Sequence, residues 1–326
     1  MAFLELDHVS VVFPAVQGLL SARKSAPVVA VDGVSLSVEK GEILGLVGES
    51  GCGKSTLSRT VMLLQKPTEG RIFLEGEELT ALSASEVRKR RPDFQMVFQD
   101  PYASLNPRFT VYATLKEALQ CRRKRTFAQT RDDVAELMEK VGLSPSLMRK
   151  YPHEFSGGQR QRVAIARALA PEPRLVIADE PVSALDVSIQ SQIINLLQKI
   201  QEDTGISYLF IAHDLSMVRY VSDDIGVMYL GKLVELADSF ELIAHSVHPY
   251  TRSLISAIPV ADPVTARQSH RIVLQGDVPS PLNPPSGCRF RTRCPYADER
   301  CAAEVPEFKE VSSGHWAACH HLDKVK

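Results

Sequence analysis

The chain has 326 residues, which is the length of about two average domains. Hydrophobic residues make up 44% and charged residues 24%, a composition typical of a folded protein with a sizeable core. Lysine and arginine number 38 against 39 acidic residues, so the net charge is −1. This balance argues against nucleic acid as a partner and against an acidic, disordered chain.

The longest stretch without a charged residue runs from His8 to Ala22 and is interrupted by a proline and a glycine. At 15 residues it is too short to span a bilayer. Acidic side chains stand at Glu5 and Asp7, where a secretory signal would carry cations. We therefore expect a cytoplasmic chain that meets a membrane only through partners.

Three strands are predicted within the first fifty residues. Alternating apolar residues indicate strands at 3–13 and 34–38, with a loop insertion at 14–28 between them. A near-continuous apolar run at 42–47 is typical of a strand buried on both faces. A glycine-rich turn follows, and helical spacing resumes at 56–64.

Two further buried strands are expected at 174–178 and 207–212, with a helix at 188–202 between them. This strand–helix–strand order predicts an α/β fold with a parallel sheet. The segment from about 100 to 170 carries mainly helical patterns and predicts a helical subdomain inserted into that fold. Its expected helices are 111–120, 131–141 and 161–169.

The composition changes again near residue 238, and prolines concentrate from 279 onward. We expect an α/β domain at 1–237 and a loop-rich C-terminal extension at 238–326. Four of the six cysteines lie in the last 39 residues, at Cys288, Cys294, Cys301 and Cys319.

Residues 48–55 read GESGCGKS and match G-x-x-x-x-G-K-[ST] in full, between a predicted strand and a predicted helix. Glycines let backbone N–H groups turn toward a phosphate chain, and the following helix presents its positive end to it. Lys54 is expected on the β- and γ-phosphates, and the Ser55 hydroxyl on Mg²⁺. The predicted ATP-binding residues here are Gly48, Ser50, Gly51, Cys52, Gly53, Lys54, Ser55 and Thr56.

A pair of acids follows the apolar strand LVIA at Asp179 and Glu180. At the end of a strand, Asp179 is expected to reach the metal directly or through water. Glu180 is expected to polarise the attacking water as general base. Paired acids at a strand end are usually a solvated turn, but a phosphate loop in the same chain favours the catalytic interpretation.

The sequence FSGGQ at residues 155–159 resembles the LSGGQ signature motif of ABC-type ATPases, with Phe155 in the place of leucine. Serine is a good N-cap, and the two glycines leave backbone N–H groups open at a helix start. The signature residues are Ser156, Gly157, Gly158 and Gln159. Together with the phosphate loop and the acidic pair, they indicate an ABC ATPase.

The resemblance implies roles for further positions. Gln99 resembles the Q-loop glutamine, which senses Mg²⁺, and Asp186 belongs to a D-loop-like segment, SALD. His213 resembles the switch histidine that contacts the γ-phosphate, and Phe13 is the candidate aromatic that stacks on adenine. In this family two ATPase domains pack head to tail, so that each ATP lies between one phosphate loop and the signature helix of the other domain.

Segments outside these motifs resemble the ATPases of oligopeptide/dipeptide permeases, in particular the F-subunit type. They are FQDPYASLNPR (98–108), YPHEF (151–155), HPYT (248–251) and PSPLNPPSGCRFRTRC (279–294). The resemblance implies a peptide importer at the cytoplasmic face of the membrane. Its partners would be two transmembrane permease subunits, a second related ATPase in a heterodimer, and an extracytoplasmic substrate-binding protein. The alternatives are a nickel or glutathione importer and a non-transport ABC ATPase, although long coiled coils typical of the latter are absent from the sequence.

The four C-terminal cysteines are separated by 5, 6 and 17 residues, unlike the short knuckles of structural zinc sites. Cys294 precedes a proline, as in ferredoxin loops, and three arginines between Cys288 and Cys294 are expected to offset thiolate charge. The family resemblance implies a [4Fe–4S] cluster on these four residues. Zinc and reduced, packed thiols remain the alternatives.

Overall fold

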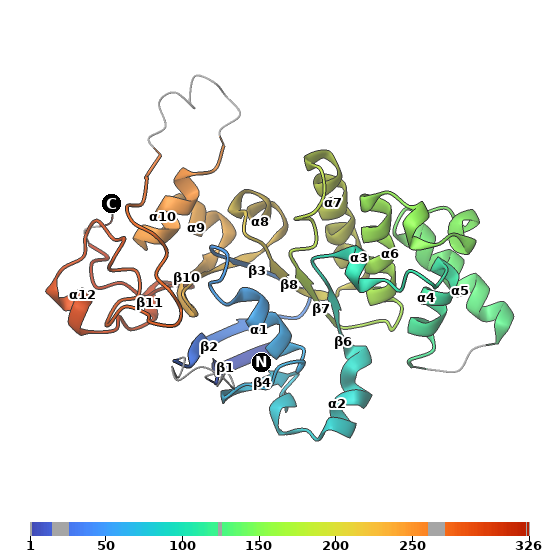
Figure 1. Cartoon of the computed structure of the whole chain (residues 1–326), viewed down its shortest axis with the longest axis horizontal. Helices are drawn as coiled ribbons and strands as arrows, with labels where there is room; N and C mark the ends of the chain where they lie inside the picture. The colour runs from blue at the N-terminus through green and yellow to red at the C-terminus, as the bar shows by residue number, and fades with distance from the viewer. Residues whose placement is uncertain (1, 15–25, 123–125, 260–270, 324, 326) are drawn as a thin grey trace, which may run out of the picture. The chain divides into compact units, whose positions relative to one another are not determined.

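In the computed structural model the chain forms two compact units. Figure 1 labels its helices and strands. Unit 1 consists of residues 1–37, 44–80 and 212–326, and unit 2 of residues 38–43 and 81–211. The residues described are 2–14, 26–122, 126–259, 271–323 and 325. Most of the loop insertion predicted at 14–28 lies outside these residues.

Unit 1 contains an antiparallel sheet with the strand order β2-β1-β4-β5. Its strands are β1 (Leu4–Phe13), β2 (Val28–Val38), β4 (Glu69–Leu74) and β5 (Glu77–Glu78). Residues Leu4, Leu6, Val9 and Val11 of β1 are fully buried, while the residues between them are more exposed. The strands expected at 3–13 and 34–38 are therefore confirmed as β1 and part of β2. The alternation of β1 places one face of the sheet in the core.

A second series of strands in unit 1 has the order β11-β12-β10-β9-β3. Its members are β3 (Ile43–Val47), β9 (Asp224–Tyr229), β10 (Lys232–Asp238), β11 (Lys309–Ser312) and β12 (His315–Ala317). All five residues of β3 are buried, and β3 runs parallel to β9, while the other pairs are antiparallel. The predicted buried strand at 42–47 is therefore confirmed.

The helices of unit 1 are α1 (Lys54–Val61), α8 (Leu215–Val221), α9 (Ser239–His245), α10 (Pro249–Ser256) and α12 (Glu299–Ala303). Residues 271–298 contain neither helix nor strand, as the proline-rich composition predicted. Phe290 anchors this irregular segment. It is 1% exposed and packs against Tyr229 and Tyr250, with ring centroids 5.2 and 5.5 Å away.

Unit 2 contains three parallel strands in the order β8-β7-β6. They are β6 (Phe94–Val97), β7 (Leu175–Asp179) and β8 (Ser207–Ile211). Helix α7 (Val187–Thr204) connects β7 to β8, and all residues of both strands are buried. The predicted strand–helix–strand unit and the α/β fold class are confirmed.

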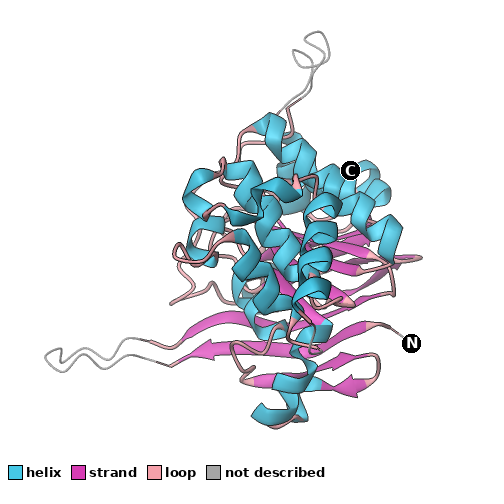
Figure 2. Cartoon of the chain, turned by 90° about the vertical axis from the view of Figure 1, so that its right-hand side faces the viewer, coloured by secondary structure: helices cyan, strands magenta, loops and turns pink. Residues whose placement is uncertain are grey.

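Helices occupy the chain between β6 and β7, in the region expected to be a helical subdomain (Figure 1). Figure 2 shows the helices in cyan and the strands in magenta. They are α3 (Pro101–Ser104), α4 (Val111–Leu119), α5 (Phe127–Lys140) and α6 (Gly157–Leu169), with 3₁₀ turns at 145–149 and 152–154; α2 (Ala84–Arg90) precedes β6. Thr110, Thr126 and Ser156 cap α4, α5 and α6 through their hydroxyl groups. Across the described residues, no helix combines the length and apolarity that a membrane span requires.

Candidate functional site

The phosphate loop joins β3 to α1 in unit 1, as predicted. Gly48 and Gly53 have positive φ angles of 154° and 107°. A side chain at either position would meet backbone: an added Cβ would lie 2.2 Å from the Met228 carbonyl oxygen at Gly48 and 2.2 Å from the Ala30 carbonyl oxygen at Gly53. The loop therefore needs glycine at both positions for its conformation and for its close packing.

Lys54 is 4% exposed, and its ammonium group is held over the loop by backbone carbonyls. Its Nζ donates to the carbonyl oxygens of Gly48 and Glu49 at 2.6 and 3.1 Å. Gly53 is the N-cap of α1 and makes no side-chain cap, so the first N–H groups of this helix depend on other partners. A buried cation beside a helix start is an anion-binding arrangement.

Cys52 contributes to the loop mainly through its backbone. Its N–H donates to the Glu49 carbonyl oxygen at 3.2 Å, and its own carbonyl accepts from the Gly231 N–H at 2.8 Å. Burial raises the pKa of the Cys52 thiol. Ser50 and Gly51 are exposed at the tip of the loop, and Ser55 and Thr56 are half-buried at the start of α1.

Two more predicted residues belong to unit 1. Phe13 ends β1 and is 38% exposed, which leaves its ring accessible. His213 is exposed in the short connection from β8 to α8.

In unit 2, Asp179 is the last residue of β7 and is 5% exposed, while Glu180 follows it in a left-handed conformation with φ 47°. The Glu180 N–H donates to the Ile211 carbonyl oxygen at 2.9 Å, which ties the turn to β8. The Glu180 carboxylate accepts from Gln99 Nε2 at 2.8 Å. Such a backbone conformation costs a non-glycine residue about 1–3 kcal/mol and is concentrated at functional sites.

The signature residues form the start of α6 in unit 2. Ser156 is the N-cap: its Oγ accepts from the Gln159 N–H at 3.3 Å, and Gln159 Oε1 accepts from the Ser156 N–H at 3.0 Å. This is a complete capping box. Gly158 faces α7 closely, because a Cβ there would lie 2.5 Å from Ile189 Cγ2. Asp186 is the exposed N-cap of α7.

The predicted nucleotide residues thus fall into two sets, one in each unit. Phe13, His213 and the loop at 48–56 belong to unit 1. Gln99, the signature residues 156–159, the acidic pair at 179–180 and Asp186 belong to unit 2. Within unit 2, the hydrogen bond from Gln99 to Glu180 joins two residues predicted from separate motifs.

The four C-terminal cysteines share one neighbourhood in unit 1. None of the six cysteines is in a disulfide. The Cys288 N–H donates to the Cys301 carbonyl oxygen at 2.8 Å, and Cys319 Sγ accepts from the His321 N–H at 3.4 Å. The pKa values of Cys294 and Cys319 are raised to about 11, mainly by burial, and the nearby thiols of Cys288 and Cys301 contribute to this rise.

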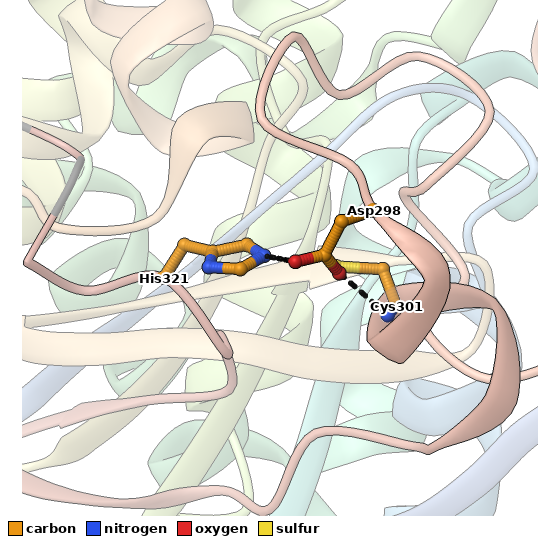
Figure 3. Close-up of side chains that lie close together, drawn as sticks. All are labelled: Asp298, Cys301 and His321. Carbon is orange, nitrogen blue, oxygen red and sulfur yellow. Dashed lines mark hydrogen bonds and ion pairs between the residues drawn. The ribbon is translucent and has the colours of Figure 1, made fainter.

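A second group of possible metal ligands overlaps this one at Cys301 (Figure 3). Asp298 Oδ2 lies 2.9 Å from His321 Nε2, and Asp298 Oδ1 accepts from the Cys301 N–H at 3.1 Å. The ligand atoms of these three residues lie within 4.8 Å of one another. The sequence-based ligand assignment names the cysteines alone, because Asp298 and His321 fit no metal-binding spacing.

The arginines between Cys288 and Cys294 make their hydrogen bonds to oxygen acceptors, and the charge of Arg291 partly offsets the rise that burial causes in the pKa of the Cys288 thiol. Arg289 binds the Asp32 carboxylate and the Leu230 carbonyl oxygen, and Arg293 binds the Glu49 carboxylate. Arg291 donates to the Ser286 carbonyl oxygen at 2.9 Å. Carboxylate and carbonyl oxygens are stronger acceptors for guanidinium groups than sulfur is.

Comparison with known proteins matches residues 31–183 to the family described as ABC transporter and residues 234–301 to the one described as oligopeptide/dipeptide transporter, C-terminal region. The oligopeptide transport ATP-binding protein AppF of Bacillus subtilis is 54% identical over 318 residues, which cover 97% of this chain and 96% of AppF. The oligopeptide transport ATP-binding protein OppF of Salmonella typhimurium is 52% identical over 91% of this chain and 89% of OppF.

The chain belongs to the ABC transporter ATPases. Within them it groups with the oligopeptide transport ATP-binding proteins, as its permease-like segments indicated. Among solved structures, the ABC cassette MJ0796 in a dimeric post-hydrolysis state with ADP and Pi is 28% identical. The structural alignment covers 72% of this chain and 98% of the MJ0796 chain, with a TM-score of 0.64.

Two residues that contact the phosphate loop of this ABC ATPase were not predicted as site residues. They are Tyr250 and Arg293, which bind the backbone and the side chain of Glu49. Both lie in segments recognised as permease-like, HPYT and CRFRTRC, but the contact joins positions more than 200 residues apart. No local spacing could reveal it.

Proposed function

We propose that this ABC ATPase hydrolyses ATP to drive the import of peptides through a membrane permease. The main support is the length of the similarity: AppF and OppF, which are named oligopeptide transport ATP-binding proteins, match both the ATPase region and the cysteine-containing extension. We infer that residues 1–237 carry the ATPase and that residues 238–326 form an extension particular to this transporter group.

In the proposed reaction, Lys54 and the loop N–H groups bind the β- and γ-phosphates. Ser55, Gln99 and Asp179 offer a hydroxyl, an amide and a carboxylate oxygen, the ligands that Mg²⁺ prefers, and bound Mg²⁺ would neutralise charge on the phosphates. Glu180 takes a proton from the attacking water, and its hydrogen bond from Gln99 orients the carboxylate. His213 donates to the γ-phosphate, and Phe13 stacks on adenine.

The proposed partner for this subunit is a second, related ATPase. Its phosphate loop would hold an ATP that Ser156 and the start of α6 complete from this chain, and the capping box preorganises that helix start. The assembly would include two transmembrane subunits at the cytoplasmic face of the membrane and an extracytoplasmic peptide-binding protein.

We also propose that Cys288, Cys294, Cys301 and Cys319 hold a [4Fe–4S] cluster. Their thiols influence one another electrostatically, and Cys288, Cys294 and Cys319 each accept a backbone N–H bond, as cluster thiolates commonly do. Anaerobically purified protein should contain about four irons and four sulfides per chain. Zinc without sulfide would refute the cluster and favour a site that includes Asp298 and His321.

The transport function is tested by reconstituting the chain with its neighbouring permease subunits and second ATPase in proteoliposomes. Peptide added with its binding protein should stimulate ATP hydrolysis, and a labelled tripeptide should accumulate. Glu180→Gln should abolish both, whereas Glu172→Gln, which changes another left-handed glutamate of unit 2, should leave them intact. Uptake of a nickel chelate or glutathione with no peptide uptake would contradict the peptide assignment.

A further inference from the structure

The cysteine-rich segment of the extension contacts the phosphate loop through one ion pair. The Arg293 guanidinium donates to both carboxylate oxygens of Glu49, with Nη1–Oε2 2.7 Å and Nη2–Oε1 3.0 Å. The Arg293 side chain is 9% exposed and that of Glu49 is 29% exposed. A two-point, mostly buried arginine–carboxylate pair is among the strongest and most directional contacts that side chains make.

The backbone of Glu49 is also bound by a residue of the extension. Its N–H donates to the Tyr250 hydroxyl at 2.8 Å. The Tyr250 ring is fully buried and packs edge-on against Tyr229, with a centroid distance of 4.7 Å, and against Phe290. Phe290 lies in the cysteine-rich segment itself, so one aromatic cluster fixes the segment and the hydroxyl that binds the loop.

A second arginine of the segment reaches the loop indirectly. Arg289 binds the Asp32 carboxylate and the carbonyl oxygen of Leu230, and its side chain is 11% exposed. Gly231, which follows Leu230 in the chain, donates its N–H to the Cys52 carbonyl oxygen at 2.8 Å. The segment thus supports the phosphate loop near Glu49 and near Cys52.

Glu49 is the residue on which these contacts converge. Its carbonyl oxygen accepts from Lys54 Nζ, its N–H is bound by Tyr250, and its carboxylate is bound by Arg293. A carboxylate in a loop that receives a triphosphate has the same sign of charge as the ligand and would repel it. Arg293 offsets that charge and fixes the backbone that holds the phosphate-binding lysine.

We propose that Arg293 is a positioning residue for the nucleotide, which acts by neutralising and orienting Glu49, so that the segment from Cys288 to Cys294 sets the ATP affinity of the phosphate loop. The proposal rests on the ATPase function of this chain. It gives the extension a task inside the ATPase, in addition to any cluster that its cysteines hold.

The test measures Mg²⁺–ATP binding to the full-length chain, purified anaerobically, with a fluorescent ATP analogue. Arg293→Ala should weaken binding about 10-fold or more, because it leaves a carboxylate unpaired beside the phosphates. In turnover assays, KM should rise while kcat changes little, because Arg293 affects binding and not the reacting atoms. Arg291→Ala is the matched control, because Arg291 lies in the same segment but contacts Ser286, and its affinity should equal that of the wild type.

Removing the carboxylate separates positioning from general damage. If Arg293 acts through Glu49, the double variant E49Q/R293A should bind ATP within about 3-fold of E49Q alone. Arg293→Lys should recover part of the loss, because lysine keeps the charge but not the two-point geometry. Tyr250→Phe keeps the buried ring and removes only the hydroxyl, so it should weaken binding about 3-fold or more even if Arg293→Ala fails to fold.

Wild-type affinity in Arg293→Ala and in Tyr250→Phe would overturn the proposal. The proposal would also fail if Arg293→Ala weakened ATP binding as much in the E49Q background as in the wild type. Arg293 would then act independently of Glu49. Failure of the wild-type chain to bind Mg²⁺–ATP is a different result, because it would refute the ATPase function itself.

Discussion

The two glycines of the signature sequence should respond in opposite ways to alanine substitution, although they are neighbours. An added Cβ at Gly158 would lie 2.5 Å from Ile189 Cγ2, a contact that real structures do not tolerate. At Gly157 the nearest atom is Leu185 Cδ2 at 3.3 Å, at the flexible end of a side chain. Because isoleucine is β-branched, its Cγ2 cannot move away without a change of χ1, whereas a leucine methyl can shift by a few tenths of an ångström.

Alanine replaces glycine at the first two positions of α6, so the gain in helix propensity is at most the roughly 0.5–1 kcal/mol of a helix interior. Overpacking at Gly158 costs about 1–3 kcal/mol, so G158A should lose about 1–2 kcal/mol in the free energy of unfolding. At about 2–4 °C per kcal/mol, its Tm should fall by about 2–8 °C. G157A should stay within about 2 °C of the wild type or rise slightly.

The measurement is thermal unfolding followed by circular dichroism, with a double variant to identify the obstacle. Ile189→Ala removes Cγ2, so G158A should cost less in the I189A background than in the wild type, with a coupling energy of about 1 kcal/mol. Equal Tm values for G157A and G158A, or an unchanged cost of G158A in the I189A background, would show that packing against α7 does not require this glycine.

Three further predictions concern catalysis, loop geometry and pH. Glu180→Gln should lower ATP turnover about 10²–10³-fold while Mg²⁺–ATP binding persists, and a turnover near that of the wild type would disprove its role as general base. Gly53→Ala should abolish ATP binding, because its Cβ would lie 2.2 Å from the Ala30 carbonyl oxygen; binding within 10-fold of the wild type would contradict this geometry. Burial lowers the pKa of His248 from 6.5 to about 4, so its stabilising contribution is present above pH 6.5 and is lost as pH falls toward 4. The loss is at most about 1.4 kcal/mol per pH unit, and His248→Asn, which can still cap α10, should unfold with a shallower dependence on pH over this range.

The sequence predicted the elements whose patterns are local. The strand at 42–47 is apolar at nearly every position because its two faces are buried, and the helix that follows the FSGGQ motif begins at a capping serine. The phosphate loop was recognisable because its chemistry requires particular residues at adjacent positions. The bond from Gln99 to Glu180 links two motifs that were each visible alone.

Contacts between distant segments could not be predicted. β11 and β12 are short and lie in a region whose prolines and cysteines suggested only loops, and they exist because β10 offers them a partner. The arginines near the cysteines pair with Asp32 and Glu49, which stand more than 240 residues earlier in the chain. The left-handed conformation of Glu180 has no signal in its residue type, because glutamate rarely adopts it.

The return of the chain terminus to β10 has a consequence for shortened versions of this protein. The family match to the extension ends at residue 301, whereas β12 begins at His315 and pairs Trp316 with Leu236 and Ala317 with Glu235. A chain cut at the end of that match would leave one side of β10 with unpaired N–H and carbonyl groups. It would also strip the buried Glu235 carboxylate of its bond to His315. Open strand edges recruit other strands, so such a fragment should self-associate and precipitate on expression, even though it retains every motif that identifies an ABC ATPase.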